Sequence, residues 1–304
     1  MSEKTLTIGI ATINRAKYLK QTINNIYKNR ISNLKQIIIV DQTKESENDI
    51  DLKLYFESID FDILYLIQET PSVCLARNTI INNVKTDIVL FFDDDILINS
   101  QTLISHLNLY DFENVKSSIG NIYNRRNEFD INELDVSKPE IGTFNPFSYL
   151  KKIETNFILD SISCNQGFDL KSIKSIGGFD ENFKGGYYED SDLGIRFRNK
   201  GYKIGFDPLA MVLHLKAPMG GLRFDNIQSN KESEKLLSYV LYFVRYFNVI
   251  KKWQMLKIIL RAGPFRKKNV INPILHIKSW FQLFYCFFKA YKIKNTVKSS
   301  VLIN

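Results

Sequence analysis

Short apolar segments alternate with segments of helical periodicity over residues 5–92, and this alternation constrains the fold more than any other feature. The apolar segments are rich in β-branched residues and cover residues 5–12, 36–40, 61–67 and 87–92; the helical ones cover 16–29, 50–58 and 73–84. Strand–helix–strand units of this length favour right-handed crossovers. We therefore predict an α/β fold, with a Rossmann-like, mostly parallel central sheet and helices on both faces.

Polar side chains follow each of the four predicted strands at the point where the strand ends. They are Thr12 and Asn14, then Asp41 and Gln42, then Gln68 and Glu69, and finally Asp93, Asp94 and Asp95. Ligands of open α/β sheets bind beyond the carboxyl ends of the strands. The sequence thus predicts one polar site along one edge of the sheet.

The three consecutive carboxylates at 93–95 are the sharpest feature of that edge. A buried strand that ends in three carboxylates is electrostatically costly unless cations or hydrogen-bond donors meet them. Divalent ions such as Mn²⁺ and Mg²⁺ bind carboxylate oxygens and keep positions open for phosphates. The alternative is a solvated strand end that caps the next helix. Because no Lys or Arg lies nearby in the sequence, we favour the metal site.

The second half of the chain is less regular. Residues 124–150 lack a clear period and indicate a loop, whereas 203–206 and 211–215 are typical of short strands, and regular structure is expected at 157–164. Helices are predicted over 169–175 and 191–199, with a glycine pair between them and Gly201 after the second.

Charge divides the chain near residue 230. Residues 231–304 contain 15 Lys and Arg against 2 Asp and Glu, a net charge of +13, whereas residues 1–230 contain 26 against 31, a net charge of −5. We predict an α/β domain over 1–230 and a basic, aromatic-rich helical tail over 231–304.

Three cysteines, Cys74, Cys164 and Cys286, lie far apart without metal-ligand spacing, which favours a reduced compartment and a role as small buried residues. The N-terminus lacks a signal pattern, and no uninterrupted apolar run reaches the ~18 residues that span a bilayer. We expect a cytoplasmic protein, at most peripheral on the inner face of the plasma membrane.

A series of motifs runs through residues 5–216. They are ATINR at 11–15, IIIVDQT at 37–43, ARN at 76–78, FFDDD at 91–95, GGFDE at 177–181, EDSDLGIRFRNKGY at 189–202 and VLHLK at 212–216. In their order and spacing they resemble a family-2 glycosyltransferase with the GT-A fold. The resemblance implies an inverting, metal-dependent and non-processive transferase of hexosyltransferase type. Such an enzyme moves a sugar from a nucleotide-diphosphate donor to an acceptor hydroxyl, here in cell-surface polysaccharide or glycolipid assembly.

On the donor side, the resemblance implies that Thr12 and Asp41 hold the base and ribose. Arg77 matches a position near the sugar or diphosphate, which suits a guanidinium because its fork can engage phosphate oxygens in two places. A UDP-sugar is the favoured donor, with dTDP- and GDP-sugars as alternatives.

The resemblance also assigns the acidic motif. Asp93 and Asp95 match the outer positions of the D-x-D motif, of which the first faces the ribose and the last binds Mn²⁺ or Mg²⁺; Asp94 is grouped with the donor-binding residues. His214 matches a position that meets the metal or diphosphate. A lone histidine within the apolar run MVLHL also fits a satisfied core residue, and that alternative stays open.

For the acceptor side, the resemblance implies that Asp190 is the general base and that Glu189 is an acceptor or support contact. Acidic residues are also common at a helix N-terminus because of its dipole. Asn165 and Gln166 are expected on the acceptor side, with a turn as the alternative. Lys216 and Arg223, in a segment with two glycines, are expected to form a lid over the diphosphate or else a loop that leads to the tail.

The basic tail has two interpretations. Its apolar and aromatic residues recur at helical spacing with basic residues among them, which fits a helical appendage packed on the catalytic domain or an interfacial helix pair on a membrane. A membrane surface is the favoured partner, together with a saccharide or lipid-linked acceptor. Nucleic acid is not expected as a partner, because the aromatic residues follow a helix face.

Other functions fit the sequence less well. A sugar-phosphate nucleotidyltransferase shares the architecture but would carry a Gly-rich, Arg-containing loop after the first strand. A catalytically inactive GT-A-like binding protein is disfavoured by the intact acids at 93, 95 and 190. Dinucleotide-binding and P-loop motifs do not occur, and a processive synthase would carry Q-x-x-R-W and membrane spans.

Overall fold

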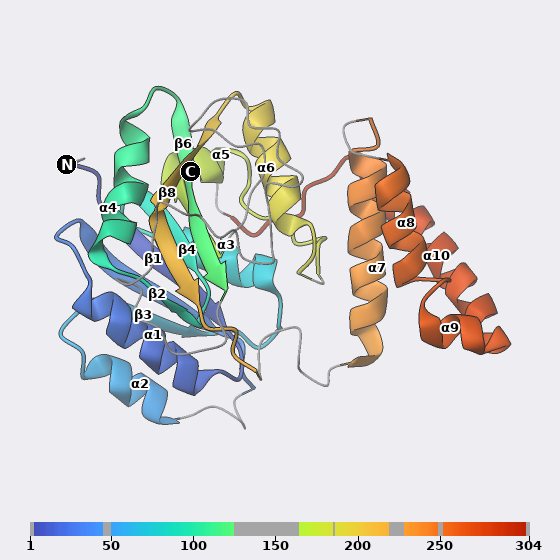
Figure 1. Cartoon of the computed structure of the whole chain (residues 1–304), viewed down its shortest axis with the longest axis horizontal. Coiled ribbons are helices and arrows are strands. Elements are labelled where there is room, and N and C mark those ends of the chain that lie inside the picture. Colours follow the sequence, from blue (N-terminus) through green and yellow to red (C-terminus); the bar gives the residue numbers. More distant parts are fainter. Residues whose placement is uncertain are drawn as a thin grey trace.

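A sheet of eight strands forms the centre of the described chain (Figure 1). The computed structural model describes residues 3–44, 50–124, 164–184, 186–218, 228–248 and 252–301. The strands are β1 (Leu6–Thr12), β2 (Leu34–Asp41), β3 (Ile63–Ile67), β4 (Ile88–Phe92), β5 (Ile96–Leu97), β6 (Val115–Asn124), β7 (Asn165–Asp169) and β8 (Lys203–His214). Their order across the sheet is β3-β2-β1-β4-β7-β6-β8-β5.

The first four strands form the parallel half of the sheet, as the alternating sequence predicts. Strand β7 runs antiparallel to β4 and β6, while β8 is parallel to β6 and antiparallel to β5. The two short strands predicted at 203–206 and 211–215 are one strand, β8. The prediction divided it because Pro208 and its neighbours fall in an irregular stretch, where the pairing with β6 passes from Asp207 directly to Val212.

Helices cover both faces of the sheet. On one face lie α1 (Ala16–Lys28), α2 (Ile50–Glu57) and α4 (Ser100–Asn108), followed by a short 3-10 turn, η2 (Leu109–Asp111); on the other lie α3 (Val73–Asn83), α5 (Leu170–Ser175) and α6 (Glu189–Asn199). Strand β2 shows why a continuous apolar run is needed. Its Ile37 and Ile39 pack against α1, whereas Ile38 and Val40 pack on the α3 side.

The predicted helices agree with the structure within a residue or two, with one functional difference. The helix predicted from 191 begins at Glu189, so the Glu189–Asp190 pair belongs to the first turn of α6. The predicted loop at 124–150 and the predicted regular segment at 157–164 lie almost entirely outside the described residues.

The C-terminal part is helical, as predicted. It contains α7 (Gln228–Arg245), α8 (Lys252–Ala262), α9 (Lys267–Ile271) and α10 (Pro273–Ile293), which lie together beside the sheet-containing part in Figure 1. Among the described helices, none combines the length and apolar character that a membrane span requires. The chain then returns to the sheet-containing part, where Asn82 Nδ2 donates to the Ser300 carbonyl (2.9 Å) and Val301 is buried.

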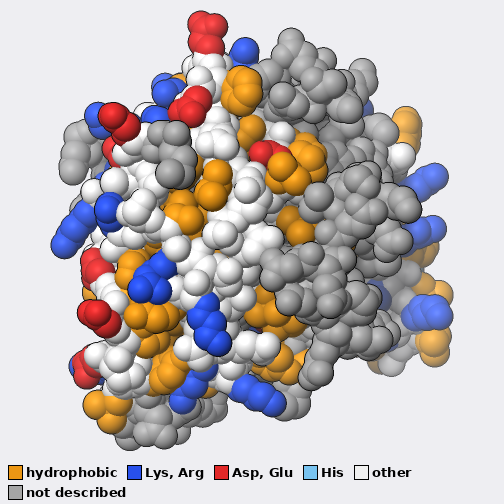
Figure 2. Space-filling model, turned by 60° about the vertical axis from the view of Figure 1, so that its left-hand side comes forward, with side chains coloured by type: hydrophobic (Ala, Val, Ile, Leu, Met, Phe, Trp, Pro, Cys, Tyr) orange, Lys and Arg blue, Asp and Glu red, His pale blue; other side chains and the backbone are white. Residues whose placement is uncertain are grey.

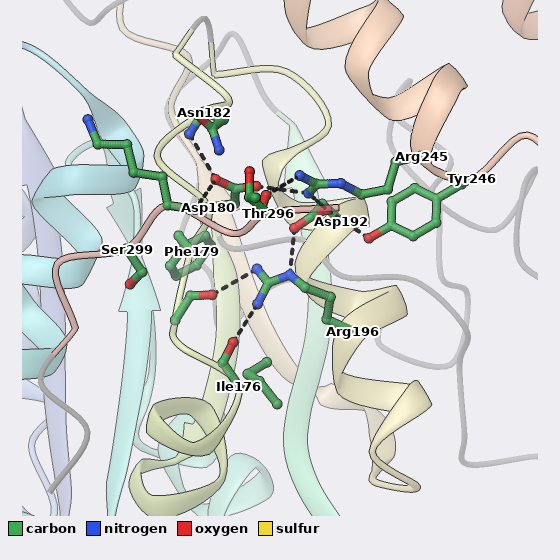
Figure 3. A network of polar contacts seen from close by, with 12 residues as sticks. Ile176, Phe179, Asp180, Asn182, Asp192, Arg196, Arg245, Tyr246, Thr296 and Ser299 are labelled. Atoms are coloured by element: carbon green, nitrogen blue, oxygen red, sulfur yellow. Dashed lines mark hydrogen bonds and ion pairs between the residues drawn. The ribbon is translucent and has the colours of Figure 1, made fainter. Parts of the chain in front are cut away.

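A buried network of charges joins α7 to α6 (Figure 3). Arg245 donates to Asp180 (2.8 Å) and to Asp192 (2.5 Å), and the Tyr246 hydroxyl donates to the same oxygen of Asp192 (2.7 Å). Arg196 binds the other oxygen of Asp192 and the carbonyls of Ile176 and Gly178. Both carboxylates are fully buried, so the network fixes how the C-terminal helices sit on the domain.

Apolar packing accompanies this network. Leu236 and Val240 of α7 belong to the same core cluster as Phe179 and Phe197 of the sheet-containing part. The boundary at residue 230 stays a prediction, but the helices that follow it share a core with the domain. We therefore expect removal of residues 231–304 to expose apolar surface that is buried in the intact chain.

Candidate active site

The polar residues at the strand ends lie together along one edge of the sheet, as predicted. Hydrogen bonds run from one strand end to the next. The backbone amide of Gln68 donates to the Asp41 carbonyl (2.8 Å), and the backbone amide of Gln42 donates to the Thr12 carbonyl (2.9 Å). The Thr12 hydroxyl donates to the Asp94 carboxylate (2.6 Å). The edge thus holds a continuous chain of mostly buried hydrogen bonds that begins beyond β3 and reaches Asp94 after β4.

A candidate metal centre forms where β4 and β8 end. Asp93, Asp95 and His214 offer two carboxylate oxygens and an imidazole nitrogen within 4.8 Å of one another. Nε2 of His214 lies 3.0 Å from Asp95 Oδ1 and 3.7 Å from Asp93 Oδ2. Two hard oxygen ligands with one imidazole suit Mn²⁺, so the residues present fit a divalent metal. His214 lies at the rim of this centre rather than in the core.

The group also holds its members in a defined protonation state. Burial lowers the pKa of His214, but the hydrogen bond to Asp95 and the charges of Asp93 and Asp95 outweigh it, and the pKa is raised. For Asp95, burial raises the pKa, yet the contacts with His214 and the backbone amide of Ala217 bring it below its ordinary value. Asp95 is therefore an ionised carboxylate.

Arg15 contributes a cation that the sequence analysis missed. It lies 2.9 Å from Asp94 Oδ1 and 3.4 Å from Asp95 Oδ2, across the 79 residues that separate it from Asp94. The expectation that no basic residue competes with a metal for these carboxylates was therefore wrong, because the fold brings the end of the ATINR motif onto them. Arg15 is the residue before α1 and makes no side-chain cap there.

Asp94 and Thr12 are bound to each other. Asp94 is 4% exposed, and its two carboxylate oxygens accept from Arg15 and Thr12. Burial raises the pKa of Asp94 to about 7, against the charge of Arg15, which lowers it. This geometry indicates that Asp94 supports the loop after β4, and a direct contact of Asp94 or Thr12 with the donor stays a prediction.

Asp41 is also fixed by protein partners. Its Oδ1 accepts from the Thr43 amide (2.8 Å) and its Oδ2 from the Tyr65 hydroxyl (2.7 Å). Tyr65 lies on β3, and nothing in the sequence singled it out. The predicted contact of Asp41 with the nucleotide is untested by this arrangement, which shows only that the carboxylate has a fixed orientation.

Arg77 joins the predicted base to the rest of the site. Its Nη1 lies 3.2 Å from Asp190 Oδ1 and 3.4 Å from Glu189 Oε1, on a helix more than a hundred residues away in sequence. Burial lowers the pKa of Arg77, but Asp190, Glu189 and then Asp93 outweigh this and raise it. Arg77 was predicted beside the diphosphate, and that role stays a prediction; in the structure the guanidinium contacts the Glu-Asp pair.

The loop before α6 holds the Glu-Asp pair in place. Tyr188, directly before it, has a left-handed backbone (φ 66°), which is strained for a residue with a bulky side chain. Its ring stacks on Tyr242 of α7 with centroids 4.5 Å apart and meets Tyr239 edge-on. The C-terminal helices therefore support the turn that presents Asp190, which remains partly exposed while Glu189 is buried.

The ARN motif at 76–78 and the GGFDE motif at 177–181 contact each other. Asn78, next to Arg77, uses both ends of its amide on the backbone of Phe179, at 2.9 Å each. The guanidinium of Arg77 lies 5.1 Å from the centre of the Phe179 ring. The ARN and GGFDE motifs thus form one structural unit behind the site.

Asn165 and Gln166 lie inside the sheet. Both are fully buried in β7. The Asn165 amide donates to the carbonyls of Asn121 and Ala210 and accepts from His106, and Gln166 donates to Ser117. Their amides satisfy polar groups of neighbouring strands, and the predicted acceptor-side role stays a prediction.

Two further predicted residues lie beyond β8. Lys216 is exposed with a left-handed backbone (φ 54°), and the next amide, that of Ala217, donates to Asp95. Arg223 lies outside the described residues, so the predicted lid stays a prediction.

Cys164, predicted as a buried apolar residue, is half-buried; burial and the charges of Asp93 and Asp190 raise its thiol pKa well above the usual range.

Comparison with known proteins identifies the family. Residues 7–177, more than half of the chain, match the profile of glycosyl transferase family 2. The chain belongs to this family. A 90-residue stretch is 28% identical to the glycosyltransferase GlyA of Streptococcus pneumoniae serotype 4, which covers 30% of this chain and 13% of that protein. Only a small part of that relative is therefore matched.

Solved structures show that this member of the family has a GT-A-like fold. The mannosyltransferase PcManGT from Pyrobaculum calidifontis, in complex with GDP-Man and Mn²⁺, matches with 16% identity and a TM-score of 0.55, over 95% of this chain and 74% of its own. GalNAc-T7, with UDP, GalNAc and Mn²⁺, matches with 12% identity and a TM-score of 0.62, over 97% of this chain and 58% of its own. TarS residues 1–349 from S. aureus match at 15% identity and a TM-score of 0.51, over 95% of this chain and 90% of that one.

Proposed function

We propose that the protein is an inverting, metal-dependent and non-processive glycosyltransferase that moves a hexose from a nucleotide-diphosphate sugar to an acceptor hydroxyl. Membership of glycosyl transferase family 2 supports the reaction class. One observation carries the proposal for the site: Arg77 forms ion pairs with Asp190 and Glu189, and the charge of Asp93 acts on the same guanidinium. This link supports the proposal that Asp190 and the acidic residues after β4 belong to one site, although they come from separate motifs.

Asp190 is the proposed general base. It lies in the first turn of α6 and is partly exposed, and Arg77 orients its carboxylate. In the proposed reaction the acceptor oxygen attacks the anomeric carbon from the side opposite the diphosphate, and its proton passes to Asp190. The bond between the anomeric carbon and the phosphate oxygen breaks, and its electron pair leaves with the nucleoside diphosphate. A phosphate leaving group of this kind needs no protein acid.

Asp93, Asp95 and His214 would hold the divalent metal. When bound, such an ion supplies Lewis-acid stabilisation of the negative charge on the departing diphosphate. The chain itself contributes the fixed orientation of Asp95, which Arg15, His214 and Ala217 contact. Mn²⁺ in two structures of similar fold supports this choice of ion.

The donor is proposed to be a UDP-sugar, with GDP- and dTDP-sugars as alternatives. One structure of similar fold holds GDP-Man and another holds UDP, so the fold accommodates more than one base. Thermal shift with a panel of nucleotide sugars and Mn²⁺ would select among them. Assembly of a cell-surface polysaccharide or glycolipid is proposed as the setting, on the strength of the basic C-terminal helices.

The test is turnover of the donor that this panel selects, with Mn²⁺ and with a chelator. We expect release of the nucleoside diphosphate with Mn²⁺ and loss of that release in chelator, restored by excess metal. Full activity in chelator would contradict the proposal that the reaction requires a divalent metal. A sugar-phosphate nucleotidyltransferase would instead release pyrophosphate from a nucleoside triphosphate and a sugar 1-phosphate, and an inactive binding protein would bind donor without any release.

A further inference from the structure

Helix α10 is apolar on two opposite faces. One face carries small and apolar residues that are buried against the neighbouring helices; they are Ser279, Leu283, Cys286 and Ala290. The other face, which we call the outer stripe, consists of Ile274, Ile277, Phe281, Phe284, Phe288 and Tyr291. Every member of the outer stripe is more than half exposed, with Phe281 the highest at 71%. A soluble surface helix normally presents polar residues on that side.

Exposed apolar side chains also occur on the neighbouring helices. Ile271 at the end of α9 is 83% exposed and Trp253 of α8 is 78% exposed, and Tyr285 lies beside the stripe. Exposed apolar surface of this extent marks a binding surface rather than ordinary scatter, because monomeric proteins rarely expose many large apolar side chains together.

The charges around the stripe have one sign. Residues 236–301 contain no Asp or Glu, and α10 carries Lys278, Lys289 and Lys292, with Lys294 directly after it. Lys292 lies 4.1 Å from the centre of the Phe288 ring and Lys294 lies 4.0 Å from that of Tyr291. Their ammonium groups thus lie over the aromatic rings, which places positive charge directly beside the exposed stripe. By contrast, acidic and basic side chains are interspersed on the face shown in Figure 2, where the left-hand side of Figure 1 comes forward.

We propose that the outer stripe of α10, together with Ile271 just before that helix, binds the surface of an anionic lipid bilayer. The helix has 21 residues, or roughly 30 Å, and would lie in the plane of the membrane with its aromatic residues at the level of the headgroups. The flanking lysines would meet anionic lipid. The catalytic domain would then be held at the surface through α7 and the Arg245 network.

A second copy of this chain is the competing occupant. The members of the outer stripe are spaced alternately by three and four residues, which also suits a helix-to-helix seam. The positions that flank such a seam include Lys278 and Lys292, and no acidic residue between 236 and 301 can pair with them. Two copies would therefore bring like charges together, whereas an anionic bilayer offers the opposite charge along the whole helix.

The test is co-sedimentation of the full chain with vesicles of phosphatidylcholine alone and of phosphatidylcholine with phosphatidylglycerol. We expect binding to the anionic vesicles that weakens as NaCl rises from about 0.1 M to about 0.5 M, since salt screens the lysines. The variant with Phe281→Ser, Phe284→Ser and Phe288→Ser should lose binding by about tenfold or more, because it removes apolar area from the interface.

Phe112→Ser is the matched control, since Phe112 is an exposed aromatic residue at the end of η2, far in sequence from the tail. Far-ultraviolet circular dichroism should show the same helix content in both variants. Equal binding of the triple variant and the natural chain would overturn the proposal. So would a chain that ignores anionic vesicles and sediments as a dimer which the triple variant converts to a monomer, because the stripe would then bind a second copy.

Discussion

The candidate active site and the C-terminal helices use charge in opposite ways. At the site two arginines are each shared between two acids: Arg15 between Asp94 and Asp95, and Arg77 between Glu189 and Asp190. On α8–α10 the cations are exposed, and no acidic residue occurs from 236 to 301. Charge at the site therefore fixes geometry, whereas charge on the helices is available to an external partner.

Arg245 lies where these two regions meet and behaves like the site rather than like the rest of the tail. It is a buried cation from the basic region that neutralises Asp180 and Asp192 of the acidic one (Figure 3). Asp192 lies two residues after Asp190 in the first turn of α6. The attachment of the helices is therefore built into the turn that presents the proposed base.

The largest effect is expected from Asp190→Asn. An amide keeps the shape of the side chain and its contact with Arg77 but cannot take the acceptor proton. We expect kcat for transfer to fall by about 10²–10⁴-fold. Donor affinity should stay within a few-fold of the natural chain, as measured by calorimetric titration with Mn²⁺ present.

Asp60→Asn serves as the control for this substitution. Asp60 is exposed beyond α2, so its replacement removes the same charge far from the site. Turnover by Asp190→Asn close to that of the control would show that another group takes the proton. The ion pair between Arg77 and Asp190 would then have no demonstrated role in catalysis.

The sequence predicted the α/β part well because its signals are local. Continuous apolar strands such as residues 37–40 identify a two-sided sheet, and the polar residues after each strand identify the edge at which they meet. The pairing of Asp95 with His214 was predictable through the family resemblance, which links two motifs that lie far apart in the chain, whereas Asp93 was expected at the ribose.

The remainder of the site depends on contacts that no local pattern encodes. Arg15 reaches Asp94 across 79 residues, and Asn165 looks like a ligand contact in sequence while it satisfies strand carbonyls inside the sheet. The attachment of the tail was missed for the same reason, since Arg245 resembles any other cation of a basic helix until the fold buries it beside two acids.

The next effect in size is expected for Arg245→Met. The substitution leaves the buried Asp180 and Asp192 without their shared guanidinium, and loss of one partner of a buried ion pair costs about 3–5 kcal/mol of unfolding free energy. Urea denaturation should show this loss. Adding Asp192→Asn should recover part of it, because one buried charge then disappears.

Arg261→Met is the control for Arg245→Met, since Arg261 is an exposed cation of α8. Its unfolding free energy should change by no more than about 0.5 kcal/mol. If the two variants lose the same unfolding free energy, Arg245 contributes no more to stability than an exposed cation does. Charge would then fix geometry only at the candidate active site and not where α7 meets α6.

The smallest expected effect separates two glycines with left-handed backbones. At Gly178 (φ +62°) a Cβ would lie 2.5 Å from Val301 and 2.6 Å from Asn78, so Gly178→Ala adds a clash with the returning C-terminal segment to the backbone strain. At Gly201 (φ +82°) a Cβ meets nothing within 4 Å, so only the strain of about 1–2 kcal/mol applies. We expect Gly178→Ala to lower the urea midpoint more than Gly201→Ala. Equal losses would mean that residues near 301 move aside without cost, and that Arg245 and the α7 core alone attach the basic region to the domain.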